Sequence, residues 1–215
     1  MKRNGRRTRP WKLIAATIVT VALLAMVSGC PDGSLLDLVG GSDDPNGTNG
    51  GTHTVGDTGP AGGIVFYDKG SYSDGWRYLE AAPASTEWTN KPWGGFGTQV
   101  AMTGTDVGTG EANTLAIVTQ YGGEEPFENR ADYAAKLCAD LEYGGKTDWF
   151  LPSKEELNLM YWNLHVEGLG GFASANYWSS SEDVATSAWR HAFDNGSQYG
   201  DLKDFSSRVR AARAF

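Results

Sequence analysis

Cysteine and histidine are scarce in this chain of 215 residues, which contains two cysteines and three histidines. If Cys30 carries a lipid, as argued below, Cys138 has no disulfide partner, so neither a disulfide framework nor a thiolate metal site is expected. The histidines, His53, His165 and His191, stand on separate segments without the spacing of a zinc site. We therefore expect no metal, no cofactor and no catalytic residue, and a fold that depends on its hydrophobic core.

Basic residues are also few once the leader, residues 1–29, is set aside. Six of the 18 Lys and Arg residues lie in that leader, so the remainder has 12 basic and 26 acidic residues and a net charge of −14. Contacts to phosphate need clustered Lys and Arg side chains. The composition therefore argues against nucleic acid as a partner.

The leader has the pattern of a secretory signal. Its basic start is followed by an apolar run from Leu13 to Val27, and small residues then lead to a cysteine in Val27-Ser28-Gly29-Cys30. This ending resembles the lipobox of bacterial lipoproteins, in which cleavage precedes the cysteine and its thiol is acylated. The resemblance predicts a signal peptide over residues 1–29 and attachment to the membrane through a lipid anchor at Cys30. An ordinary transmembrane anchor is the alternative, although the apolar run is short for a spanning helix.

A lipid anchor would place the protein in the bacterial cell envelope, and we expect the outer membrane or the cell surface rather than the inner membrane. Residues 30–54 are rich in Gly, Asp, Asn and Thr, and such a segment cannot bury enough apolar surface to offset the entropy of ordering it. We expect a flexible tether there. Residues 55–215 hold seven of the eight tryptophans and have the length of a single domain.

The domain is predicted to combine strands with two or three helices. Ser153 and Glu156 are spaced as a capping box, which begins a helix, and Asn195-Gly196 is a strong hairpin signal. Strands are expected at 63–67, at 76–81 and through the last forty residues, a long loop at 84–110, and helices from Asn113 to Tyr121, along 127–141 and after Ser153. Strands at both ends with helices between them predict an α+β domain with mixed, mainly antiparallel sheets.

Five motifs of this domain stand in the order found in a known family. They are Gly62-Gly63-Ile64-Val65-Phe66-Tyr67, Gly75-Trp76-Arg77-Tyr78-Leu79-Glu80-Ala81-Ala82-Pro83, Asp148-Trp149-Phe150-Leu151-Pro152-Ser153-Lys154-Glu155-Glu156-Leu157, Tyr177-Trp178-Ser179-Ser180-Ser181-Glu182 and Val209-Arg210-Ala211-Ala212-Arg213-Ala214-Phe215. With these motifs, residues 55–215 resemble the Lcl C-terminal domain family, which is named after a bacterial collagen-like adhesin. The resemblance implies a C-type-lectin-like fold of the formylglycine-generating-enzyme type.

In such folds the N- and C-terminal strands pair, and a curved face of late strands and loops holds the ligand. The resemblance also implies a surface role, because the adhesin that names the family is thought to bind sulfated glycans. This chain has no collagen-like Gly-X-Y tract, so the trimeric stalk of that adhesin is not expected. Formylglycine-generating enzymes need cysteines in their C-terminal half, and none follows Cys138, which argues against inherited catalysis.

The end of the chain is expected to hold the domain together. The closing strand 208–215 should pair with the strand at 63–67. Its three arginines are predicted to form ion pairs with Glu80 or neighbouring acids rather than to contact a glycan: Arg208, Arg210 and Arg213.

The segment 176–207 is the best candidate for a binding face, because it is rich in residue types that supply adaptable hydrogen bonds and rigid rings. We hypothesise weak, salt-sensitive, multivalent binding of an anionic glycan, with Arg190 and Lys203 on one face with His191. Protonation of His191 below its reference pKa of about 6.5 would then strengthen binding. The expected ligand-binding residues are Glu182, Asp183, Arg190, His191, Asp194, Gln198, Tyr199 and Lys203.

Other sites and functions stay open at this stage. Trp88, Trp93 and Phe96 in the long loop are an alternative site, where exposed rings would stack on sugars. The favoured function is a non-enzymatic, lipid-anchored module that binds a glycan or a host or surface protein, as an adhesin or as a variable receptor. An envelope enzyme that acts on glycan or peptidoglycan, and a purely structural envelope role, are the alternatives. A cleft with ionisable groups of perturbed pKa would favour the enzyme, and a shallow polar-aromatic face on the late strands would favour binding.

Overall fold

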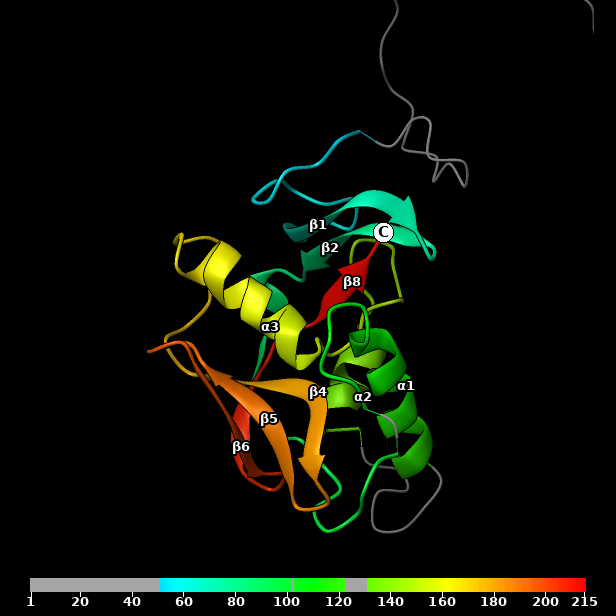
Figure 1. Ribbon diagram of the computed structural model, residues 1–215, viewed down its shortest axis with the longest axis vertical. Coiled ribbons are helices and arrows are strands. Elements are labelled where there is room, and N and C mark those ends of the chain that lie inside the picture. The colour runs from blue at the N-terminus through cyan, green and yellow to red at the C-terminus, as the bar shows by residue number, and fades with distance from the viewer. Residues whose placement is uncertain (1–50, 102, 123–130) are drawn as a thin grey trace, which may run out of the picture. The chain divides into compact units, whose positions relative to one another are not determined.

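The computed structural model describes residues 51–101, 103–122 and 131–215. The predicted signal peptide, lipidation site and nearly all of the tether therefore lie outside the described residues. The described chain is an α+β domain with two sheets and three α-helices, as predicted (Figure 1). Its elements are β1 (Ile64–Ser73), β2 (Trp76–Ala81), β3 (Trp88–Pro92), α1 (Gly110–Tyr121), α2 (Ala134–Ala139), α3 (Lys154–Met160), β4 (Asn176–Val184), β5 (Ser187–Ala192), β6 (Ser197–Leu202), β7 (Ser206–Val209) and β8 (Ala212–Ala214).

The smaller sheet joins the two ends of the domain. Its strand order is β1-β2-β8, so the N- and C-terminal strands lie in one sheet, as expected. The direct neighbour of β8 is β2, with Ala81 opposite Ala212, and not the strand at 63–67. The predicted partner strand was wrong because β1 pairs with one edge of β2, and β8 pairs with the other edge of β2.

The larger sheet has the order β3-β7-β4-β5-β6. The predicted closing strand 208–215 therefore divides between the two sheets: β7 ends at Val209 and β8 begins at Ala212. The expected long loop 84–110 likewise contains a strand, β3, which pairs with β7. In Figure 1 the two sheets lie at opposite ends of the domain, with α3 between them and α1 and α2 along one side.

The first two helices differ from their predicted bounds. Helix α1 starts at Gly110, three residues before the predicted Asn113 cap. Asn113 instead lies buried inside the helix, where its amide donates to the Gly104 carbonyl and to Ser180 Oγ at 2.8 and 3.0 Å. Of the helix predicted along 127–141, the described residues contain α2, and residues 123–130 lie outside them.

The capping box predicted at Ser153 is confirmed. Glu156 N donates to Ser153 Oγ at 3.2 Å, and Ser153 N donates to Glu156 Oε2 at 2.7 Å. The Glu156 carboxylate is buried, which raises its pKa, and it also accepts from Gly108 N at 2.8 Å. Glu156 therefore fixes the loop before α1 as well as the start of α3. The helix continues as one π-helical turn, Tyr161–His165, which buries Leu164.

Large aromatic residues are prominent in the interior. One apolar cluster contains Trp93, Trp149 and Trp178, and a second contains Phe66 and Tyr177. Cys138 is fully buried in the first cluster, and burial raises the pKa of its thiol, as expected for a core residue rather than a nucleophile. Within the described ranges, no helix is both long enough and apolar enough to cross a membrane.

Ion pairs attach the last residues of the chain to both sheets. Arg213 binds Glu80 at 3.1 Å and Asp148 at 2.6 Å. Arg208 and Arg210 both bind Glu87. The predicted pairing of these arginines with Glu80 or neighbouring acids is confirmed.

Candidate functional site

One side of the larger sheet carries alternate residues of β4, β5 and β6; it is buried at Trp178 and becomes partly exposed toward β6. In the β5–β6 hairpin Arg190 lies opposite Tyr199, and Trp178 of β4 lies opposite Arg190. Residues that face each other across paired strands point to the same side of a sheet. We call the polar group centred here the Tyr199 face, defined by Asn176, Arg190, Tyr199, Asp201 and Ser207.

Arg190 is the central cation of the Tyr199 face, and its charge is neutralised. Its guanidinium forms an ion pair with Asp201 and donates to Ser207 Oγ at 3.3 Å. The same group lies 4.8 Å from the ring centre of Tyr199 and 5.9 Å from that of Trp178. A guanidinium held between two rings and a carboxylate is fixed in place, so this surface is preorganised.

Tyr199 is the exposed ring of this face. The residue is 36% exposed to solvent, and its hydroxyl donates to Asn176 Oδ1 at 3.0 Å. Asn176 lies on β4, and Asp201 lies on β6 two residues after Tyr199. The result is a shallow surface that offers one aromatic face together with planar polar groups on three adjacent strands.

His191 and Gln198 lie on the opposite side of the hairpin, so the hypothesis of one basic face that includes His191 is wrong. Successive side chains of a strand alternate between its faces, so His191 cannot share a face with Arg190. His191 is fully buried, with its ring 4.7 Å from that of Tyr161. Gln198 donates to the Lys154 carbonyl at 3.0 Å. The residues around α3 therefore cover this side.

Burial is the main cause that lowers the pKa of His191 to about 4; the backbone at Gly196 opposes this shift, and the neighbouring His165 contributes a smaller part of it. In the unfolded chain a histidine binds a proton below about pH 6.5. Between pH 6.5 and 4 the unfolded chain binds this proton and the folded domain does not, so stability falls as the pH falls. We expect wild type to lose up to about 3 kcal/mol of unfolding free energy over this window through His191.

Urea unfolding of wild type and of His191→Gln at several pH values measures the contribution of His191 to the unfolding free energy. The variant should be less stable at pH 7 but should lose less stability on acidification. His53→Gln is the control, because His53 packs against Tyr78 and Phe215 at the other sheet. Parallel pH profiles for wild type and His191→Gln would contradict the prediction.

Lys203 and Glu182 are likewise unavailable to a ligand. They form a buried ion pair, with 0% and 4% of the two side chains exposed. Lys203 Nζ donates to the Thr98 carbonyl at 2.8 Å, and Glu182 accepts from Val100 N at 3.0 and 3.1 Å. Burial lowers the pKa of Lys203, and its bond to Glu182 opposes this shift. The pair fastens the loop after β3 to the sheet, which is a structural role that the spacing of the two residues does not indicate.

The remaining predicted site residues are exposed but separated. Asp183 lies at the end of β4 and accepts from Ser187 Oγ at 2.8 Å. Asp194 lies in the turn between β5 and β6, at the other end of the hairpin. Of the eight predicted residues, the structure thus brings Arg190 and Tyr199 together. It adds Asn176, Asp201 and Ser207. The hairpin register set by the Asn195-Gly196 turn, with side chains alternating between the two faces, could have identified some of these residues from the sequence.

The alternative site at the tryptophan loop is also only partly exposed. Trp93 is fully buried, its indole N–H donates to the Ser179 carbonyl at 2.7 Å, and Trp88 packs against the core. Phe96 is exposed. The stacking surface of three rings therefore does not exist in the folded domain.

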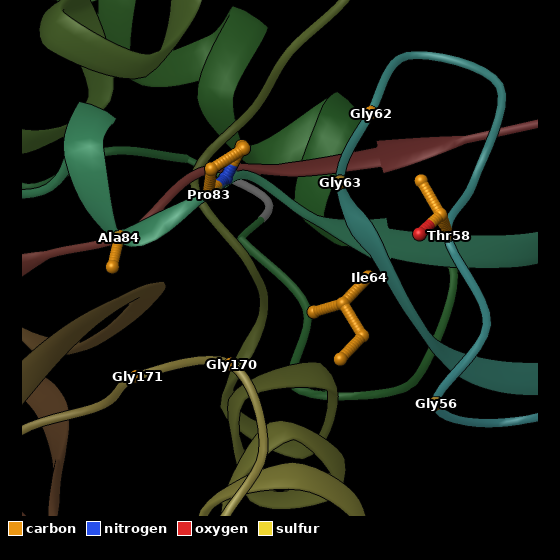
Figure 2. Close-up of a pocket in the computed structure, with 9 residues that line it drawn as sticks. All are labelled: Gly56, Thr58, Gly62, Gly63, Ile64, Pro83, Ala84, Gly170 and Gly171. Atoms are coloured by element: carbon orange, nitrogen blue, oxygen red, sulfur yellow. The ribbon is translucent and has the colours of Figure 1, made fainter.

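A cleft of about 300 Å³ lies beside β1, away from the Tyr199 face (Figure 2). Its walls are mostly backbone, and the residues that line it are Gly56, Thr58, Gly62, Gly63, Ile64, Pro83, Ala84, Gly170 and Gly171. Apart from the Thr58 hydroxyl, the side chains of this lining are apolar, so the cleft presents no titratable side chain as an acid or base. In the described parts of the chain, no three metal-ligating side chains gather in a group that would hold an ion.

Comparison with known proteins gives one family and a distant structural similarity. No curated protein sequence matches this chain. A fimbrial protein from Bacteroides ovatus has a similar structure, with a TM-score of 0.46 and 15% sequence identity. The alignment covers 65% of this chain and 36% of that chain, so this chain spans about a third of the fimbrial protein's length. The profile of the Lcl C-terminal domain matches residues 86–213, more than half of the sequence. The chain belongs to the Lcl C-terminal domain family.

Proposed function

We propose that this chain is a lipid-anchored surface protein of the adhesin type, whose domain binds an uncharged extracellular glycan through the Tyr199 face. The observation that carries the proposal is the half-exposed Tyr199 ring, fixed among polar planar groups on three strands. The C–H face of a sugar ring packs on an aromatic ring, and its hydroxyls bond to amide and carboxylate groups. Membership of the Lcl C-terminal domain family is consistent with a surface role.

The charge of the site favours an uncharged ligand over the sulfated glycan expected at first. Arg190 and Lys203 each bind a carboxylate, and the domain from residue 55 carries 12 basic against 22 acidic residues, a net charge of −10. A polyanion would meet overall repulsion and no free cationic pair. Binding should therefore change little with salt, because no counterions are released.

Tyr199→Ala should weaken glycan binding at least tenfold, since the ring supplies most of the apolar contact. Retention of the full chain by a panel of neutral oligosaccharides measures the effect. Tyr72→Ala, at an exposed tyrosine on β1, is the matched control and should bind as wild type does. Equal losses for both variants, or a steep loss with salt, would place the site elsewhere.

Anchoring is proposed on the Val27-Ser28-Gly29-Cys30 motif. Cys30→Ser should abolish labelling by radioactive palmitate and should release the protein from membrane fractions, because the acylated thiol is lost. A Cys138→Ser variant should label normally. Persistent membrane association of Cys30→Ser with an uncleaved leader would support a spanning anchor instead.

A further inference from the structure

Three turns meet at one end of the larger sheet, and hydrogen bonds between backbone atoms hold them together. Gly97 N donates to the Ala185 carbonyl at 3.0 Å, which joins the loop after β3 to the β4–β5 turn. Lys203 N donates to the Thr186 carbonyl at 3.1 Å, which joins the β6–β7 turn to the same place. Segments far apart in the sequence thus lie side by side.

Four large apolar side chains are exposed on these turns. Their accessible fractions range from 38% to 51%. We use the name turn surface for these four residues and the two exposed acids next to them in sequence: Phe96, Val184, Leu202, Phe205, Asp183 and Asp204. Single exposed apolar residues are ordinary, but a group of them rimmed by polar residues is typical of a protein–protein contact.

The turn surface stands on a rigid base. Beneath it the Lys203–Glu182 pair binds the loop backbone at Thr98 and Val100, and Lys203 Nζ lies 4.6 Å from the ring centre of Trp93. Gly95 has a φ of +65°, and a Cβ there would lie 1.9 Å from the ring of Tyr121. A surface held in this way loses little conformational entropy when a partner binds.

The exposed charges of the turn surface all have one sign. In the segments 93–99, 183–187 and 200–206, which are described throughout, Lys203 is the one basic residue, and it is buried. Asp183 and Asp204 are exposed. A second copy of this chain would bring the same carboxylates and the same net charge of −10, so self-association is opposed.

We propose that the turn surface docks a partner protein that presents an apolar side chain flanked by Lys or Arg. Phe96 and Phe205 would supply the central contact, since aromatic residues dominate the energetics of such contacts. Asp183 and Asp204 would attract the flanking cations. This site is separate from the Tyr199 face and takes a different class of ligand.

A random dodecapeptide library displayed on phage, panned on the full chain in detergent, tests the proposal. We expect enrichment of peptides with Lys or Arg next to Phe, Leu or Trp. A synthetic peptide of the enriched sequence should bind the Phe96→Ala/Phe205→Ala variant at least tenfold more weakly, and its Lys→Glu version should not bind. Leu115→Ala, at an exposed leucine of α1, is the matched control and should retain full binding.

A second pair of variants tests the charges. Asp183→Asn/Asp204→Asn should weaken peptide binding several-fold, and Glu111→Gln, at an exposed acid of α1, should not. Tyr199→Ala should bind the peptide normally, so failure here and failure of glycan binding are distinguishable. No enrichment of basic-apolar peptides, or equal binding by wild type and Phe96→Ala/Phe205→Ala, would overturn the proposal. All variants should melt as wild type does, because the altered side chains are exposed.

Discussion

Deletion of residues 209–215 should abolish cooperative folding of the domain. This segment is the link between the two sheets: it leaves the larger sheet at Val209 and forms the third strand of the smaller one as β8. Val209, Ala211 and Ala212 are fully buried. The deletion would open the edge of β2 and would leave the Glu80 carboxylate without Arg213, its buried ion-pair partner.

Thermal unfolding followed by near-ultraviolet circular dichroism measures this effect, because tryptophan signals report on tertiary packing. We expect the truncated chain to show no sigmoidal transition. Phe215→Ala, which removes one half-buried ring and keeps β8, should still unfold cooperatively. A cooperative transition of the truncated chain near the wild-type midpoint would contradict the topology described above.

Glu87→Ala should lower the unfolding free energy by about 3–5 kcal/mol, the range for breaking one side of a buried ion pair. Glu87 accepts from Arg210 Nε at 3.0 Å, from Arg208, and from the Tyr177 hydroxyl at 2.9 Å. The Arg210 side chain is fully buried, so without Glu87 its charge would be left in the interior and bonded to main-chain carbonyls alone. The loss of unfolding free energy arises because the Arg210 guanidinium would stay buried without its carboxylate partner.

Urea unfolding at pH 7 measures this loss, and Glu111→Ala on the exposed side of α1 should change stability by less than about 0.5 kcal/mol. The double variant Glu87→Ala/Arg210→Met should recover part of the loss, because it removes the stranded charge as well. A change below about 1 kcal/mol for Glu87→Ala would show that Arg210 finds other partners.

Local signals in the sequence predicted several elements well because their causes are local. The Ser153 capping box, the strand at 76–81 and the turn at Asn195-Gly196 depend on residues within a few positions of one another. Strand β3 escaped prediction because the five residues Trp88–Pro92 show no alternation and end in proline, and their pairing with β7 lies more than a hundred residues away.

The candidate binding face is predicted only in part from the sequence, and the reason is strand geometry. The segment 176–207 was correctly placed among the late strands, but Arg190, His191 and Lys203 were put on one face from their charge alone. Alternation along β5 separates the first two, and the interior takes up Lys203 with Glu182. Whether a charged side chain is free or neutralised depends on partners that are distant in sequence, such as Asp201 for Arg190.

The sequence by itself determined the α+β class, the family, the turn at Asn195-Gly196 and the ion-pairing role of the C-terminal arginines, because these follow from residue patterns, turn chemistry and motif order within short stretches of sequence. Only the tertiary structure decided which strand accepts β8, which basic groups are buried, and which exposed side chains meet. Those outcomes depend on burial: apolar side chains fill the interior, and a charged side chain is buried there only when a group of opposite charge is buried with it. The Tyr199 face and the turn surface include side chains that stay exposed along the late strands and on the turns at one end of the larger sheet.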